Sequence, residues 1–137
     1  MSLERFVTAQ AQIYPRVLAE LQAGQKQSHW MWFIFPQIVG LSGSYRGQLY
    51  AIQSLDEARE YLAHPLLGAR LRECGQAVMD VEGKSAHDIF GSPDDIKFRS
   101  SLTLFDLVAP NDIFQSALRK FFDGVADHAT LKILPSD

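Results

Sequence analysis

Apolar residues recur at steps of three and four positions through most of this 137-residue chain, and that spacing places them on one face of a helix. The first stripe covers residues 3–23 and is interrupted by Pro15. Because proline removes a backbone amide and clashes with the preceding turn, we expect two helices that meet near Ile13–Tyr14. Gly24 follows the second helix and is expected to end it.

Signals for helix starts punctuate the second half of the chain. Ser54 and Glu57 have the spacing of a capping box, and Ser92–Pro93 combines an N-cap residue with a first-turn proline. Asp112 opens a further amphipathic segment that closes at Gly124. The sequence therefore predicts a mainly α fold, compact and with a single domain over residues 1–137. A small β element near residues 30–53 is left open as an addition to that fold.

Composition and charge exclude several classes of protein. The chain is 47% hydrophobic and 21% charged, which is typical of an ordinary globular protein and not of a disordered one. Its net charge is −3, without a basic stripe that could follow a phosphate backbone, so duplex nucleic acid is not an expected partner. Cys74 is the single cysteine and no histidine pair has metal-ligand spacing, so we expect neither a disulfide, a metal nor a cofactor.

Targeting signals are not expected either. The chain starts without the basic and apolar pattern of a signal peptide. The most apolar run, residues 30–36, is far shorter than the ~20 residues of a membrane span. We therefore expect a cytoplasmic protein that does not associate with a membrane.

Residues 27–45 contain no charged side chain, and an aromatic stretch lies within them. Trp30 and Trp32 are flanked by Lys26, His29 and Gln37, and aromatic walls with a few polar groups are the composition of a ligand pocket. The same stretch is also typical of a hydrophobic core, as a buried strand or a short buried helix. Both interpretations stay open on the sequence alone.

Two further groups complete the candidate ligand-binding set. In the loop at residues 42–47, small residues and Arg46 suit an anion, although a mobile surface loop has the same composition. Lys97, Ser100 and Ser101 share one face of a predicted helix, either as ligand contacts or as a solvated face with Asp94 pairing Lys97. The full set of candidate ligand-binding residues is Lys26, His29, Trp30, Trp32, Gln37, Tyr45, Arg46, Tyr50, Lys97 and Ser101.

The string KQSHWMWFIFPQ at residues 26–37 resembles a known family, and the likeness extends over nearly the whole chain. It continues through Leu55-Asp56-Glu57-Ala58, His64-Pro65-Leu66-Leu67-Gly68 and residues 89–105. These segments are similar to the uncharacterised bacterial domain-of-unknown-function family eighteen-ten, whose members are often labelled calpastatin. The resemblance implies a single, mainly helical domain of prokaryotic type and implies no activity.

A fainter similarity joins Tyr50 through Leu71 to the YbiA-like (NADAR) family, whose members are linked to NAD and ADP-ribose metabolism. That resemblance implies a nucleotide-like or ADP-ribose ligand. The Glu-His pair that precedes the aromatic residue in that family is replaced here by Gly47-Gln48-Leu49. No catalytic residue therefore carries over.

The sequence favours binding of a phosphorylated or nucleotide-like small molecule in an aromatic-lined pocket. In a catalytic version the protein is a hydrolase of an N-glycosidic bond, with His29 or a distant aspartate as acid–base group. The alternative is a protein-interaction or antitoxin-like accessory module, in which the aromatic stretch faces a partner. Whether the protein is an enzyme, and its oligomeric state, do not follow from the sequence.

Overall fold

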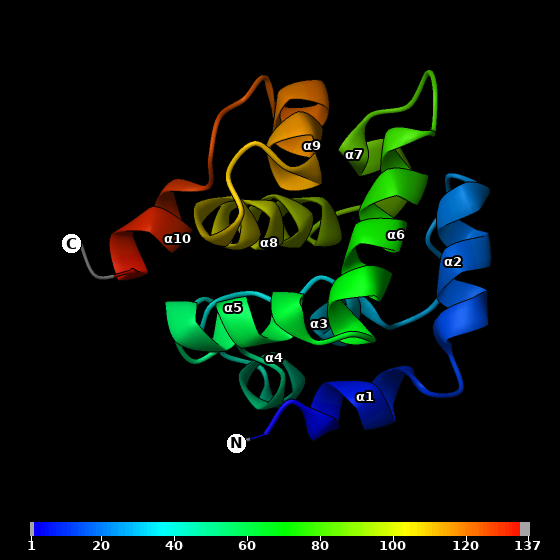
Figure 1. Ribbon diagram of the computed structural model, residues 1–137. Coiled ribbons are helices and arrows are strands. Elements are labelled where there is room, and N and C mark those ends of the chain that lie inside the picture. Colours follow the sequence, from blue (N-terminus) through cyan, green and yellow to red (C-terminus); the bar gives the residue numbers. More distant parts are fainter. Residues whose placement is uncertain (1, 135–137) are drawn as a thin grey trace.

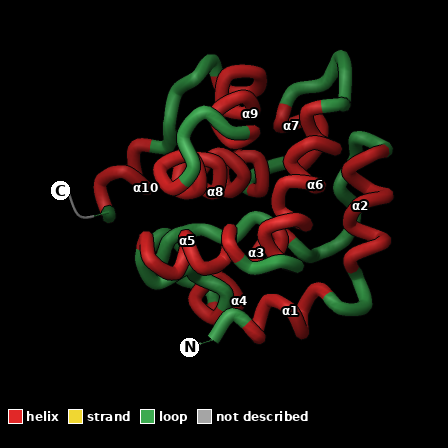
Figure 2. The backbone as a smooth tube through the Cα atoms, viewed as in Figure 1, coloured by secondary structure: helices red, strands yellow, loops and turns green. Residues whose placement is uncertain are grey.

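The computed structural model describes residues 2–134, which form ten helices joined by short loops (Figure 1, Figure 2). The mainly α fold is therefore confirmed. In chain order the helices are α1 (Glu4–Gln10), α2 (Tyr14–Gln22), α3 (Met31–Ile34), α4 (Tyr45–Leu49), α5 (Leu55–Ala63), α6 (Leu67–Met79), α7 (Ala86–Phe90), α8 (Asp94–Val108), α9 (Ile113–Phe122) and α10 (His128–Ile133).

The predicted break in the first apolar stripe is present between α1 and α2. Pro15 lies in the first turn of α2, where its missing amide has no helical partner to lose. Gly24 ends that segment with a φ of +72°, a left-handed conformation that favours glycine. Both expectations for this region are confirmed.

One hydrophobic core is shared by most of the helices, and α8 lies at its centre. This helix packs against α9 on one side and α5 on the other, and it also contacts α3, α7 and α10 (Figure 1). Phe98 and Phe105 are fully buried within it. Ser100 and Ser101 on the same helix are buried as well, so the solvated-face interpretation is wrong for the two serines.

The aromatic stretch folds as a short helix, α3, and not as a strand. Met31 and Ile34 of this helix are buried, whereas Trp32 and Phe33 are partly exposed. Among residues 2–134, pairing of the β type is limited to one parallel bridge between Ile38 and Ile52. Its two hydrogen bonds run from the Val39 amide to the Ile52 carbonyl and from the Ile52 amide to the Gln37 carbonyl, both at 2.8 Å. The β element expected near residues 30–53 is therefore a single bridge. It holds the segment after α3 against the segment before α5.

Two helix starts differ from the sequence prediction. The presumed loop at residues 42–47 contains the start of α4, because the Ser44 hydroxyl accepts a hydrogen bond from the Gly47 amide at 3.0 Å and caps the helix. At α8 the N-cap position is occupied by Pro93, without a side-chain cap. Ser92 therefore does not have the capping role that the sequence predicted.

The capping pattern at α5 is present in a modified form. The Ser54 hydroxyl accepts a hydrogen bond from the Glu57 amide at 3.1 Å, as predicted. The Glu57 carboxylate, however, accepts from the amide of Gln53 and not from that of Ser54. The carboxylate therefore reaches one residue beyond a capping box, and its other contact explains why.

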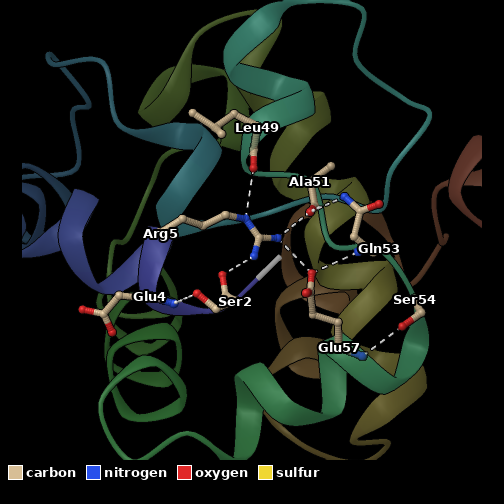
Figure 3. Close-up of polar contacts among 8 residues, drawn as sticks. All are labelled: Ser2, Glu4, Arg5, Leu49, Ala51, Gln53, Ser54 and Glu57. Carbon is tan, nitrogen blue, oxygen red and sulfur yellow. Dashed lines mark hydrogen bonds and ion pairs between the residues drawn. The ribbon is translucent and has the colours of Figure 1, made fainter.

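Arg5 of α1 is the second partner of Glu57 (Figure 3). Its guanidinium lies 2.9 Å from the carboxylate and also donates to the backbone carbonyls of Leu49 and Ala51, at 3.0 and 2.8 Å. The side chains of the ion pair are each 11% exposed. This cluster fastens α1 to the segment between α4 and α5.

Candidate ligand site

Trp30 is completely buried, at the start of α3. Its indole Nε1 donates to the Glu20 carboxylate at 2.9 Å, and the Lys26 ammonium lies 5.1 Å from its ring centroid. An indole with no exposed surface cannot stack on a ligand. The stacking role that the sequence suggested for Trp30 is therefore corrected to a role in the core.

Glu20 of α2 is the acceptor that makes this burial possible. Besides the Trp30 indole, its carboxylate accepts from the amides of Gln27 and Ser28 and from the Ser28 hydroxyl, at 2.6–3.0 Å. Burial opposes ionisation of the carboxyl group, but these hydrogen bonds outweigh burial and lower its pKa to about 2. The segment between α2 and α3 is thus organised around one buried charge.

Trp32, one half-turn further on, has a different environment. It is partly exposed, and two cations lie over its ring: the Arg46 guanidinium carbon at 5.4 Å from the ring centroid and the Lys97 Nζ at 5.3 Å. Its Nε1 atom is buried and has no hydrogen-bond partner among the described residues. A buried indole N–H without an acceptor is costly, so the position of Trp32 is set by packing and by the two cations and not by a hydrogen bond of its indole.

The charges around Trp32 are only partly compensated. Asp94 lies 2.8 Å from the Lys26 ammonium and 3.7 Å from that of Lys97, so its closer partner is Lys26. Arg46 is exposed, and no carboxylate within residues 2–134 forms an ion pair with it. A chain of alternating charges thus runs from Lys26 through Asp94 to Lys97, and Arg46 adds an unpaired cation at its end.

Lys97 also lines a pocket of about 400 Å³ between the first turns of α8, the segment at residues 37–43 and the start of α10. Its lining mixes polar and apolar groups: Gln37, Ser42, Lys97, Ser100 and Asp127, with Leu41, Gly43, Pro93, Ile96 and Ala129. This volume lies within the range of small-molecule sites. The Lys97 side chain therefore contacts both the pocket and the Trp32 indole.

Five of the ten predicted site residues lie at or next to this pocket, either in its lining or in contact with a lining residue or its neighbour. Gln37 and Lys97 line the pocket, Trp32 and Arg46 contact each other beside Lys97, and Lys26 is joined through Asp94. The Lys26 ammonium is already bound to Asp94 and to the Ser28 carbonyl, so its role is to hold Asp94 in place and not to contact a ligand.

The other predicted residues are placed elsewhere or are enclosed. His29 and Tyr45 are exposed and do not line the pocket, and Tyr50 packs between the rings of Phe6 and Phe33. Ser101 is buried in α8, and its hydroxyl has no hydrogen-bond partner among the described residues. The sequence was right that Ser101 shares the Lys97 face of the helix, but its hydroxyl is not at the surface.

Sequence reasoning missed Asp127 and the apolar wall formed by Leu41 and Ile96. Asp127 caps α10, where its carboxylate accepts from the Thr130 amide and from the Ser100 hydroxyl. An aspartate two residues before a threonine-containing apolar run is a helix-start signal, so this cap could have been predicted. Its approach to α8 could not, because that contact spans 27 positions of the chain.

Another hollow of the described residues is less suited to an anionic ligand. It has a volume of about 350 Å³, lies between α2 and α6, and is lined by the acidic side chains of Glu73 and Asp80 and by no lysine or arginine. Within residues 2–134 no cluster of histidine, cysteine and acidic side chains could hold a metal ion. None of the helices in that range is long and apolar enough to cross a bilayer.

The fold and the pocket define a small, mainly helical protein with an amphipathic pocket of ligand size. The chain belongs to the family described as "Protein of unknown function (DUF1810)", whose model matches residues 1–134. The resemblance to the domain-of-unknown-function family eighteen-ten is therefore confirmed.

A solved structure supports the same fold. The crystal structure of the conserved hypothetical protein Rv1873 from Mycobacterium tuberculosis is 48% identical to this chain and superposes with a TM-score of 0.96. The match covers 98% of this chain and 97% of that one. A comparison with curated proteins found no match.

Proposed function

We propose that this protein binds a small phosphorylated or nucleotide-like molecule in the pocket at the start of α8. The observation that carries the proposal is the convergence of Lys97 and Arg46 on the Trp32 ring, next to a pocket with apolar and polar walls. Cations at a partly apolar hollow suit a ligand that has both an anionic group and a less polar body.

The alternative interpretation, a protein-interaction module, has less support. It required an aromatic stretch that faces a partner, but Trp30, Met31, Ile34 and Phe35 are all buried. The exposed large apolar side chains of the described residues are distributed over several elements, among them Tyr45 on α4, Ile96 on α8 and Leu131 on α10. Ligand binding is therefore the function that the geometry favours.

Hydrolysis of an N-glycosidic bond is not part of the proposal. Such chemistry needs a positioned acid–base group. His29 is outside the pocket, and the acidic side chain in the pocket lining, Asp127, is engaged in capping α10. Binding without a catalytic assignment is the function that these residues support.

A thermal-shift panel tests the proposal directly. Nucleotides, sugar phosphates and ADP-ribose derivatives are added to the wild-type protein and to the Lys97→Gln and Arg46→Gln variants. A ligand at 100 times its Kd should add about 2.7 kcal/mol to the free energy of unfolding of the wild type. Both variants should reduce the shift, whereas the Arg59→Gln variant on the exposed side of α5 should retain it. No shift with any compound would refute the proposal.

A further inference from the structure

The first step concerns what Trp32 can offer to a ligand. Two cations already lie over its ring, Arg46 at 5.4 Å and Lys97 at 5.3 Å from the centroid. A base that stacked on this indole would have to displace a cation–π contact that is favourable in itself. Trp30 offers no alternative surface because it is completely buried. Stacking is therefore a poor use of this site.

The second step concerns charge. Asp94 is held more closely by Lys26 than by Lys97, at 2.8 against 3.7 Å, and Arg46 has no acidic partner among residues 2–134. Two cations beside one ring therefore carry more positive charge than their surroundings balance. An arginine fork with a lysine ammonium suits a phosphate, since one supplies paired N–H donors and the other a mobile point charge.

The third step concerns the unpartnered indole N–H. The Nε1 atom of Trp32 is buried and donates to no described residue. Because this atom has almost no exposed surface and Trp32 does not line the pocket, the indole N–H is not among the donors that a ligand there can reach. The donors for one oxygen-rich group are therefore the exposed Arg46 guanidinium and the Lys97 ammonium.

Resting on the proposed function, we infer that the site recognises its ligand by a single phosphomonoester group, held by Arg46 and Lys97 beside Trp32. The rest of the ligand lies in the adjoining pocket, against Leu41 and Ile96. The carboxylate of Asp127 in the same pocket opposes a second phosphate, so one phosphate is preferred to a diphosphate.

Calorimetric titration of the wild-type protein with AMP, ribose 5-phosphate, ADP and adenosine tests this inference. AMP and ribose 5-phosphate should bind within about tenfold of each other, because they share the phosphate. Adenosine should bind about a hundredfold more weakly than AMP, since it lacks the charged group. ADP should bind more weakly than AMP.

Three variants extend the test. Arg46→Gln and Lys97→Gln should each weaken AMP about tenfold or more. Arg59→Gln, which removes an exposed charge from α5, is the matched control and should leave AMP affinity unchanged. Thermal melting of each variant verifies that it is folded.

The outcomes separate the two proposals. Adenosine binding as tightly as AMP would overturn phosphate recognition, and ADP binding as tightly as AMP would overturn the preference for a single phosphate. Either result would leave nucleotide-like binding intact. Unchanged AMP affinity in both cation variants would likewise overturn the inference and move the binding site elsewhere. Failure of every compound to bind the wild-type protein would reject the proposed function together with the inference.

Discussion

Glu20 shows how one side chain can determine the conformation of a whole segment. Four hydrogen bonds reach its carboxylate from a turn and an indole 7–10 positions later in the chain. These donors have few alternatives, because they lie in the partly buried stretch between α2 and α3. The ionised carboxylate is therefore a structural requirement of the aromatic segment.

Replacing Glu20 by glutamine should lower the free energy of unfolding by about 2–3 kcal/mol, because a neutral amide accepts more weakly and adds donors of its own. Urea unfolding followed by circular dichroism measures the loss. Glu60→Gln, at an exposed position of α5, is the control and should change stability by less than about 0.5 kcal/mol. An equal effect of both substitutions would contradict the role given to Glu20.

The same carboxylate predicts a pH dependence with a definite sign. Its pKa falls from 4.5 to about 2 on folding, so the folded state binds the proton less tightly than the unfolded state. The stabilisation is fully present above about pH 4.5 and is lost as the pH falls toward 2. Urea midpoints measured from pH 6 to pH 2.5 should fall more steeply for the wild type than for Glu20→Gln. Parallel curves for the two proteins would exclude this contribution.

Cys74 belongs to the same scale, because its reactivity is determined by its surroundings. The thiol is completely buried in α6, and burial raises its pKa to about 12. A disulfide reagent should therefore label the native protein about a thousandfold more slowly than the protein in concentrated guanidinium. Rapid labelling of the native protein would show that this part of the core opens locally.

Residue roles were predictable from the sequence only in part. That the two tryptophans would need hydrogen-bond acceptors follows from their N–H groups. Trp30 and Trp32 nevertheless differ in burial and in the residues that surround them. One has Glu20 as its partner, ten positions earlier, and the other has cations from residues 14 and 65 positions later. Such long-range partners depend on how the helices pack, and the local spacing of residues in the sequence does not determine that packing.

At the scale of elements, the contacts of Arg5 attach α1 to the rest of the fold. Arg5→Ala should lower the free energy of unfolding by about 2–4 kcal/mol, because it removes the cation that pairs with the largely buried Glu57 carboxylate and one donor from each of two backbone carbonyls. Chemical denaturation measures the change. The matched control is Arg59→Ala, whose pair with Asp56 is exposed and should contribute less than about 1 kcal/mol. Comparable losses in both variants would argue against a fastening role.

The junction of α5 and α6 depends on a close approach at Gly68. A β-carbon at this position would collide with the backbone carbonyl oxygen of Leu62. Gly68→Ala should therefore destabilise the protein by about 1–3 kcal/mol, despite the higher helix propensity of alanine. Gly43→Ala is the control, since a β-carbon there meets no atom within 4 Å. Urea midpoints compare the two, and a stabilised Gly68→Ala protein would contradict the predicted collision.

Helix positions were largely predictable, and the exceptions have physical causes. The spacing of apolar residues and the helix-start signals identified α1, α2, α5, α8 and α9. The start of α4 was missed because its residues suit a loop equally well, and only the Ser44 cap distinguishes the two. The aromatic stretch of α3 was ambiguous because a four-residue helix is too short to show a clear period.

At the scale of the whole molecule, the candidate site joins three separate parts of the chain around α8. Lys97 and Ser100 come from that helix, Gln37 and Ser42 from the segment after α3, and Asp127 from the start of α10. The sequence identified two of these five lining residues as candidates, Gln37 and Lys97. It also indicated Ser100 by helix-face spacing and Ser42 as part of the loop at residues 42–47. It could not identify Asp127, because a pocket between elements exists only after the elements have packed.

The two sides of this pocket are built very differently. One is the first turn of α8, a helix that contacts five others, and the opposite side continues into a five-residue helix whose Tyr45 and Arg46 are largely exposed. Changes in residues 41–46 therefore cost the core little, whereas changes in α8 affect folding itself. Substitutions among these six residues would therefore change the shape and polarity of one pocket wall, while the packing of the helices around α8 would stay constant.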